Sequence, residues 1–271
     1  MKSFLLCSML FLHFIANAQW YPQPMPLYKK DFAKVAANKY TVAFEYEING
    51  DEKILTRMLE FGAQGLPAGL YTKGTNENGD STNIAETIYK FDGSGRLIKE
   101  TNEDKEEGSE WTTIYTYGKD GKLIKKQTVS IDPPTTTYTY QNGRIVKTYT
   151  TQRMPLVDEN GESHGKAVER PQQKETFVYD KTGLLKEIWI YNLFNEDGNK
   201  KWSRKIRFTY NAAKQLTKRE NLDEEEKVYN TETYEYQPNG LLKKSTVKGD
   251  DEEEKTYVYE YCTTCIQSWM K

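Results

Sequence analysis

A closely spaced cysteine pair near the C-terminus is the most sharply defined motif of this 271-residue sequence. Cys262-Thr-Thr-Cys265 directly follows Tyr257-Val-Tyr-Glu-Tyr261, an alternating pattern typical of a β-strand. Redox-active pairs with this spacing lie at the start of a helix, and a structural zinc site needs four ligands rather than two. If the chain is exported, a disulfide between Cys262 and Cys265 is the preferred prediction, with redox or metal chemistry as the alternative.

Histidine is nearly absent, which limits the catalytic chemistry that the sequence can support. His13 lies in an N-terminal leader described below, so His164 is the one histidine of the remaining chain. The sequence contains no Gly-x-Ser-x-Gly, no His-Glu-x-x-His and no phosphate-binding glycine loop that leads into a helix. The 40 acidic residues leave a glycosidase-type carboxylate pair open. We nevertheless predict that the protein is not an enzyme, with no catalytic, cofactor-binding or metal-binding residues.

Four aromatic residues lie in or next to a short irregular stretch at 192–201 and form a candidate binding surface. They are Trp189, Tyr191, Phe194 and Trp202. Clustered rings on an exported β-sheet can stack on sugar rings, which makes them candidate ligand-stacking residues. Large aromatic side chains more commonly lie on the core face of a sheet, and the core face is the preferred interpretation here.

The N-terminus has the layout of a secretory signal peptide. Lys2 precedes an apolar run from Phe4 to Ile15, and the small residues Ala16-Asn-Ala18 follow it. A run of about 12 residues is too short to cross about 30 Å of hydrocarbon, which argues against a membrane anchor. Cys7 lies inside the run, where lipid modification would strand the rest of it. We predict cleavage before Gln19 and a secreted, periplasmic or cell-surface location without a membrane span.

The charge balance is close to neutral. The chain carries 38 Lys and Arg against 40 Asp and Glu, and loss of Lys2 with the leader would leave 37 against 40. This balance gives no electrostatic basis for binding nucleic acid or an anionic membrane surface. Tyrosine is frequent at 20 residues while cysteine is scarce at 3. The fold must therefore depend on packing and strand pairing rather than on a disulfide framework.

One short pattern recurs along most of the chain, which indicates a supersecondary unit used many times. In five of six copies an aromatic residue is followed six residues later by Leu, and the third copy is one residue shorter. The copies are Phe91-Asp-Gly-Ser-Gly-Arg-Leu97, Tyr117-Gly-Lys-Asp-Gly-Lys-Leu123, Tyr140-Gln-Asn-Gly-Arg-Ile145, Tyr179-Asp-Lys-Thr-Gly-Leu-Leu185, Tyr210-Asn-Ala-Ala-Lys-Gln-Leu216 and Tyr236-Gln-Pro-Asn-Gly-Leu-Leu242.

Each copy predicts a β-hairpin. A second aromatic residue lies two positions before the first, as in Tyr115 and Tyr117, and a spacing of two places both rings on one face of a strand. Thr, Lys, Glu and Arg occupy the alternate positions, which favours a strand with one wet face. The central Asx and Gly residues suit a tight reversal. We therefore expect Tyr117, Tyr179, Tyr210 and Tyr236 to lie in the core.

These residues resemble the YD repeat of Rhs-type proteins. Phe91-Asp-Gly-Ser-Gly-Arg-Leu97 is similar to the consensus Tyr-Asp-x-x-Gly-Arg-Leu, and Tyr210–Leu216 matches it with Lys214 in place of Gly. The resemblance covers residues 86–262. Large members of that family wind their repeats into a hollow shell around a toxic C-terminal domain. This chain departs from them in length and shows no such domain, so an encapsulating role is not implied.

The segments between hairpins differ from the repeats in composition. Several are acidic, such as Asp223-Glu-Glu-Glu226, and we expect them at the edge opposite the glycine turns, where solvated connections keep strand edges soluble. They lack the alternating ligands and the Gly of a calcium loop, although binding of cations along that rim is the alternative. The stretch 151–175 lacks strand periodicity and predicts a long loop, either mobile or functional.

The domain organisation follows from these segments. We predict a signal peptide at 1–18, an extended lead-in at 19–39 with a short helix over Asp31–Asn38 as an option, and a single repeat domain at 40–271. Within it, Tyr40–Ile48 and Ile54–Phe61 form a divergent terminal hairpin around Asn49-Gly50. The fold class is all-β, an antiparallel array of about seven or eight hairpins in a curled sheet that could close into a barrel or roll.

The function that these patterns favour is binding or scaffolding rather than catalysis. The ligand would be a glycan or a partner protein, and a purely structural protein of the cell envelope is the alternative. An outer-membrane barrel is the third reading, and the Lys, Glu and Thr of the hairpins argue against the outward apolar belt of about 25 Å that it requires. No cofactor is expected.

Overall fold

The computed structural model describes residues 29–62, 64–75, 81–129, 134–154, 167–193, 203–250 and 253–263. Within these ranges the chain forms one helix, α1 (Lys29–Ala37), followed by sixteen strands. The strands are β1 (Val42–Asn49), β2 (Glu52–Phe61), β3 (Pro67–Thr75), β4 (Ser81–Phe91), β5 (Leu97–Asp104), β6 (Ser109–Tyr117), β7 (Leu123–Val129), β8 (Thr135–Gln141), β9 (Arg144–Met154), β10 (Val168–Tyr179), β11 (Leu185–Asn192), β12 (Arg204–Tyr210), β13 (Leu216–Asp223), β14 (Val228–Tyr236), β15 (Leu242–Gly249) and β16 (Lys255–Cys262).

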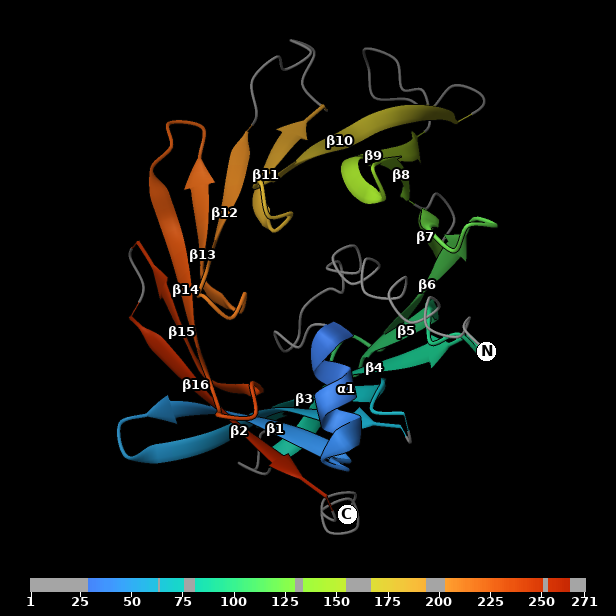
Figure 1. Ribbon diagram of the computed structural model, residues 1–271. Coiled ribbons are helices and arrows are strands. Elements are labelled where there is room, and N and C mark those ends of the chain that lie inside the picture. Colours follow the sequence, from blue (N-terminus) through green and yellow to red (C-terminus); the bar gives the residue numbers. More distant parts are fainter. Residues whose placement is uncertain are drawn as a thin grey trace, which may run out of the picture.

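The strands form a closed antiparallel barrel (Figure 1). Each strand pairs with its neighbours in sequence, and β1 closes the ring by pairing with β16, from Val42 opposite Cys262 to Ile48 opposite Thr256. The predicted all-β array of hairpins is thus confirmed, and the curled sheet closes completely. Closure removes the exposed edges that an open sheet would present to other chains.

The glycine turns lie together at one end of the barrel, here called the turn end, and their geometry explains the repeat consensus. In the first copy Asp92 N donates to Arg96 O, and Gly95 N donates back to Asp92 O, both at 2.9 Å. The Asp92 carboxylate accepts hydrogen bonds from the backbone N of Ser94 and Arg96 at 2.9 and 3.0 Å. Gly95 has a φ of 72°, where a side chain would be strained. The Asp and Gly of the consensus are therefore turn residues.

The same pair of backbone hydrogen bonds recurs at the turns after β6, β10, β12 and β14. In the copy that lacks Gly, Lys214 itself adopts the left-handed conformation with a φ of 59°. A further copy, missed in the sequence, joins β2 to β3: Gly62 N donates to Leu66 O and Gly65 N to Gly62 O, each at 2.8 Å. It escaped notice because Pro67, rather than Leu, stands six residues after Phe61.

The two aromatic residues of each repeat face the lumen, the inside of the barrel. Tyr89, Tyr115 and Tyr234 lie on separate strands yet share one buried cluster with Leu97 and Leu242. A register shift between Lys90 and Phe91 leaves Ile98 of β5 without an opposing residue and places Leu97 opposite Phe91. The predicted core tyrosines also pack against the luminal clusters, which confirms the prediction: Tyr117, Tyr179, Tyr210 and Tyr236.

The second tyrosine also connects each repeat to the one before it. The Oη atoms of Tyr117, Tyr179 and Tyr236 donate to the backbone oxygens of Leu97, Ile145 and Leu216 at 2.8, 2.8 and 2.7 Å. At Tyr117 and Tyr179 the residue before that Leu or Ile is an Arg that stacks on the same ring. Arg96 lies 5.0 Å from the ring centroid of Tyr117, and Arg144 lies 5.5 Å from that of Tyr179. These contacts assign packing roles to the Tyr, the Arg and the Leu of the consensus.

Tyrosine ionisation at high pH is expected to unfold the barrel. Burial raises the pKa of Tyr117, Tyr140 and Tyr179 to about 12, against about 10 in an unfolded chain. Because the folded pKa values are the higher ones, their contribution to stability is complete below pH of about 10 and is lost as the pH rises through about 12. Tyrosinate absorbance should therefore appear together with loss of the β circular dichroism. Ionisation of all tyrosines near their ordinary pKa with the fold intact would contradict this expectation.

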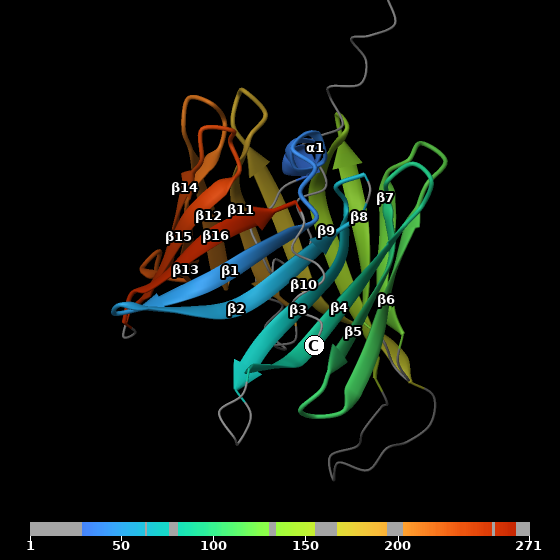
Figure 2. The ribbon, with the colours of Figure 1, turned by 90° about the horizontal axis from the view of Figure 1, so that it is seen from below.

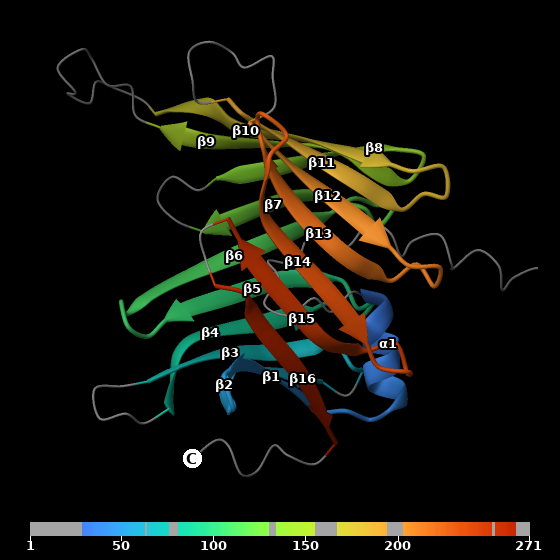
Figure 3. The same ribbon diagram turned by 90° about the vertical axis from the view of Figure 1, so that its left-hand side faces the viewer.

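Helix α1 lies inside the ring at the turn end (Figures 1 and 3). Phe32 and Val35 belong to the luminal core cluster, and Lys34 Nζ donates to Gly240 O at 2.8 Å. A Cβ at Gly65 would lie 2.5 Å from Phe32 O, so the turn between β2 and β3 can approach the helix only with glycine. The optional helix of the lead-in is confirmed, and it packs in the mouth of the barrel.

The connections at the opposite end, here called the loop end, agree with one prediction and differ from another. The acidic connections lie there as expected, between β5 and β6, β13 and β14, and β15 and β16 (Figure 2). The long loop predicted at 151–175 is wrong at both of its ends, because β9 continues to Met154 and β10 starts at Val168. Both faces of these strand ends are polar and Pro171 lies at a register shift, so no alternation marks them.

Several predictions concern residues that lie outside the described ranges. The signal peptide at 1–18, the start of the lead-in and His164 are among them. The centre of the predicted loop, 155–166, is also outside, as are Phe194, Trp202 and Cys265. The division into leader, lead-in and repeat domain remains a prediction.

Candidate functional site

Polar side chains line the lumen beyond the aromatic core. Glu45, Glu100 and Glu175 have exposures of 0, 4 and 6% although they lie on three well separated strands. Each faces inward, because each pairs with, or lies two residues from, an inward aromatic residue. Burial of such groups is unfavourable unless they are hydrogen-bonded. The lumen therefore changes from apolar at the turn end to polar toward the loop end.

Glu45 and Arg57 form an ion pair in this polar layer, in which the carboxylate is fully buried and the Arg57 side chain is 27% exposed. They occupy opposing positions on β1 and β2, and the guanidinium binds both carboxylate oxygens, with Nε to Oε1 at 2.5 Å and Nη2 to Oε2 at 2.6 Å. Thr56 Oγ1 donates a further hydrogen bond to Oε1 at 3.0 Å. This two-point geometry is the strong form of a carboxylate pair.

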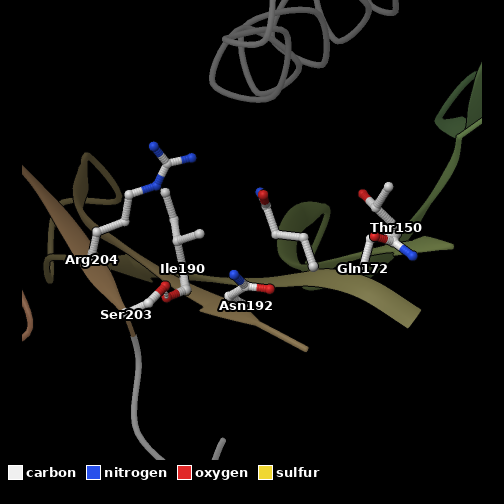
Figure 4. Close-up of a pocket in the computed structure, with 7 residues that line it drawn as sticks. Thr150, Gln172, Ile190, Asn192, Ser203 and Arg204 are labelled. Atoms are coloured by element: carbon white, nitrogen blue, oxygen red, sulfur yellow. Dashed lines mark hydrogen bonds between the residues drawn. The ribbon is translucent and has the colours of Figure 1, made fainter. Parts of the chain in front are cut away.

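A cavity of about 550 Å³ opens among β9, β10, β11 and β12 near the loop end. Figure 4 shows Thr150, Ile190 and Arg204 projecting toward the same side of the sheet. Most of the lining consists of neutral polar side chains together with one guanidinium. The lining residues are Thr150, Gln172, Gln173, Ile190, Asn192, Ser203 and Arg204.

Strand register brings these side chains together. Gln173 on β10 lies opposite Thr150 on β9 and opposite Asn192 on β11, and Ile190 on β11 lies opposite Arg204 on β12. Opposing residues of an antiparallel sheet share a face. Ile190 is part of the luminal core, so this row faces the lumen.

Glu175 lies on the same inward face of β10, next to the cavity. Thr148 Oγ1 and Gln173 Nε2 donate to its carboxylate oxygens, each at 2.7 Å. Burial raises the pKa of this carboxyl group, while both hydrogen bonds and the nearby charges of Arg204 and Lys126 act in the opposite direction. The two donors hold Glu175 in one orientation, and Glu175 in turn orients the amide of Gln173.

The chemistry available in the cavity is recognition by hydrogen bonds. Asn192 and Gln173 carry amide donors and acceptors, Thr150 and Ser203 carry hydroxyls, and Arg204 adds a forked cationic donor. Across the described ranges no group of three or more His, Cys, Asp and Glu could hold a metal ion. A ligand rich in hydroxyl groups, with or without an acidic group, matches this lining.

The structure places the predicted stacking residues away from the cavity. Trp189 and Tyr191 lie opposite Thr176 and Lys174 on the outer face of the barrel. They are half-buried, and the Nζ of Lys174 lies 3.8 Å from the ring centroid of Tyr191. The preferred core-face interpretation is therefore wrong for these two, because Ile188 and Ile190 occupy the core positions of β11. Phe194 and Trp202 lie outside the described residues.

The predicted cysteine pair is described only at its first member. Cys262 ends β16 opposite Val42 and is disulfide-bonded. Cys265 lies outside the described residues, so its pairing with Cys262 remains a prediction.

The sequence interpretation missed the luminal polar residues. Glu175 lies two residues before Phe177 and four before Tyr179, so it shares the face of the two aromatic residues. A polar residue spaced by two or four positions from an aromatic pair was therefore the sequence signal that could have identified the luminal polar residues. They were assigned to the wet outer face with the other Lys, Glu and Thr of the repeats, because the sequence alone does not reveal that the sheet encloses a lumen.

Comparisons with known proteins concern the fold. No protein-family model matches the chain, and no curated protein matches it. Within the described ranges no helix has both the length and the apolar character that crossing a membrane requires. Among solved structures, TcdB2-TccC3 has 11% identity and a TM-score of 0.21 over 81% of this chain and 15% of that one, too low to support an argument.

A porin-like protein from Bacteroides uniformis is the structural match that shows the fold. Its crystal structure covers 82% of this chain and 97% of its own, with 11% sequence identity and a TM-score of 0.50. At this identity the likeness concerns the path of the backbone alone. The chain is thus a closed antiparallel β-barrel with a solved structural counterpart.

Proposed function

We propose that this chain is an exported cell-envelope barrel that binds a polar ligand, with a glycan as the favoured class, in the luminal cavity near the loop end. The observation that carries the proposal is the lining of that cavity, in which Asn192, Gln173 and Arg204 converge from three strands. A pocket of hundreds of cubic ångströms with a few convergent polar groups is a typical small-ligand site. A partner protein at the same rim is the alternative ligand.

The outer face supports a barrel surrounded by water rather than lipid. Outward pairs along β12 to β15 are charged or polar, such as Arg207 opposite Glu220 and Glu235 opposite Lys244. Along β4 and β5 the outward pairs include Lys90 opposite Lys99. A charged residue facing lipid at mid-membrane is unfavourable by about 2–4 kcal/mol, and this surface carries many.

The packing at the turn end supports a closed pocket rather than a pore. The Bacteroides uniformis protein is described as porin-like, and a pore needs an open path. Here α1 and the Tyr and Leu cluster pack together at the turn end, with Val35 and Leu241 at 0% exposure. We therefore propose a pocket closed at one end rather than a channel.

The repeats support the relation to YD-type sequences. Each consensus position has a physical role in this barrel: Asp92 orders the turn, Gly95 reverses it, Arg96 stacks on the next ring and Tyr117 bonds back to Leu97. We propose that the chain uses YD-type repeats to build a short closed barrel.

A glycan-array screen followed by calorimetry with the best sugar tests the proposed ligand and its site. Arg204→Ala should weaken binding by at least about tenfold, because a hydrogen bond to a charged group contributes about 1.5–3 kcal/mol. Asn192→Ala should weaken it by about two- to tenfold, because a hydrogen bond between neutral groups contributes about 0.5–1.5 kcal/mol. Thermal melts of both variants should match the parent, since the two side chains lie at the rim.

The matched controls are Trp189→Ala and Tyr191→Ala on the outer face. Both should bind with the parent affinity. Loss of binding in these controls, with parent affinity in Arg204→Ala, would move the site to the outer aromatic residues. A chain that binds no sugar on the array would contradict the glycan proposal.

A further inference from the structure

Trp111 faces the lumen without being packed into its core. It lies on β6, two residues from Thr113 and four from Tyr115, and β6 pairs with β5 without a register shift. The Tyr115 hydroxyl donates to Oε2 of luminal Glu100 at 2.8 Å, so this face of β6 points inward. Tyr115 belongs to the luminal core with an exposure of 5%, whereas Trp111 is 42% exposed. The indole of Trp111 is therefore presented to the lumen.

The repeat places Trp111 at the same depth in the barrel as the cavity. Trp111 lies six residues before the second aromatic residue of its hairpin, and Gln173 and Arg204 occupy the same position in their hairpins. In all three hairpins that second aromatic residue directly precedes the turn at the turn end. Trp111, Gln173 and Arg204 are thus equally far along their strands from the turn end.

The register confirms that equivalent repeat positions share one level. Opposing luminal residues form a row over Tyr115, Lys126, Thr136, Thr150 and Gln173. Tyr115 lies two residues before the second aromatic residue of its hairpin, whereas Gln173, two hairpins later, lies six residues before it. The row therefore shifts by two residues per hairpin toward the loop end. Such a stagger accompanies the tilt of the strands in a closed barrel (Figure 3).

Polar side chains line the wall between Trp111 and the cavity. The Oγ1 atoms of Thr136 and Thr150 share a hydrogen bond at 2.9 Å, and Lys126 lies opposite Thr136. Four strand spacings separate β6 from β10, which is about 19 Å along the wall at about 4.8 Å per strand. A single sugar ring cannot contact both Trp111 and Gln173 over this distance, whereas a chain of rings can.

We propose that the luminal site extends from Arg204 around the wall to Trp111, and that its ligand is an oligosaccharide whose far end stacks on the Trp111 indole. This inference rests on the proposed glycan function and narrows the class of ligand. The C–H face of a sugar ring is apolar and packs on the face of an aromatic ring, while the indole N–H donates to a hydroxyl. Arg204 and Gln173 hold the other end by hydrogen bonds.

Calorimetry with oligosaccharides of increasing length tests this stacking role in the full-length protein. The probes are the cello-, malto-, xylo-, manno- and chito-oligosaccharides, each from the monosaccharide to the hexasaccharide. In a series that binds the parent, affinity should rise with length until the chain reaches β6. In Trp111→Ala the affinity for the hexasaccharide should fall by about tenfold, because the stacking contact is lost. The shortest sugar that binds should keep its parent affinity.

Three further variants separate stacking from other effects. Trp111→Phe keeps an aromatic face and should retain most of the gain in affinity with length. Trp189→Ala changes the outer face and should match the parent at every length. Arg204→Ala acts at the opposite end of the site and should weaken binding at every length. All variants are compared where their circular dichroism matches the parent, and thermal melts of both Trp111 variants should do so because the ring is exposed.

A second measurement uses the parent alone and so does not depend on the folding of a variant. N-Bromosuccinimide oxidises accessible indoles, and peptide mass spectrometry reports each tryptophan separately. The hexasaccharide should slow the oxidation of Trp111 and leave that of Trp189 unchanged. The monosaccharide should protect neither.

The possible results distinguish this inference from the function on which it rests. Parent-like length dependence in folded Trp111→Ala, with weaker binding in Arg204→Ala, would overturn the stacking role and leave the luminal site in place. An equal loss at every length in Trp111→Ala, or no protection of Trp111 by the hexasaccharide, would overturn it as well. Absence of binding by every series would contradict the glycan function together with the stacking role. A loss confined to the longer sugars supports the inference.

Discussion

Replacement of Arg57 by Met is expected to lower the free energy of unfolding by about 3–5 kcal/mol. Arg57 binds both oxygens of Glu45, whose side chain is fully buried. Removal of the guanidinium leaves a buried carboxylate that keeps the hydrogen bond from Thr56 Oγ1 but has lost its neutralising charge. A buried charge that has lost its partner carries most of its desolvation penalty. Urea denaturation of the parent and of Arg57→Met measures the difference.

The double variant Glu45→Leu with Arg57→Met is the control for this prediction. Replacing a buried pair by apolar residues of similar volume is often neutral or stabilising, so the double variant should recover most of the lost stability. An additive loss in the double variant would show that packing around Arg57, rather than the pairing of charges, produces the effect.

Truncation of Tyr179 to Ala is expected to lower the free energy of unfolding by about 3 kcal/mol. The ring packs in the luminal cluster of Ile145, Phe177 and Leu185. Its hydroxyl donates to Ile145 O, and Arg144 stacks on its face. The milder change Tyr179→Phe keeps the ring and removes the hydrogen bond, so it should cost about 1 kcal/mol. Thermal and urea melts measure both losses.

Tyr149 provides a matched control on the outer face. It lies on β9 with 38% exposure, and Tyr149→Ala should change stability by no more than about 0.5 kcal/mol. If Tyr179→Ala melted with the parent while Tyr149→Ala lost several kcal/mol, the assignment of the two faces of the sheet would be reversed.

The hairpins could be predicted because their determinants are local. The spacing of Tyr115 and Tyr117 places both rings on one face, and the Asx and Gly residues between strands set a reversal within a few bonds. The helix of the lead-in and the position of the acidic connections follow from similarly short-range patterns. The turn at Gly62–Leu66 uses the same geometry and was missed because one consensus position is occupied by Pro67.

The site could not be predicted because its members are distant in sequence. Thr150, Gln173, Asn192 and Arg204 become neighbours only through the pairing of four strands. Each of them looks like a residue of the wet face, and Trp189 and Tyr191 look like core residues. Which face is the lumen depends on the direction in which the sheet curls, and no single hairpin specifies that direction.

The sequence by itself determined the unit of this protein: an aromatic hairpin with a defined turn, repeated along an almost neutral chain. Tertiary structure decided that the strands close into a ring through the pairing of β1 with β16, that α1 packs inside one end of it, and that carboxylates such as Glu45 are buried rather than solvated. The physical reason is the sequence separation of the residues that interact. Turn geometry and strand alternation are set by neighbours a few residues apart, whereas closure requires β1 to meet β16 and thereby creates an inside that no local pattern contains.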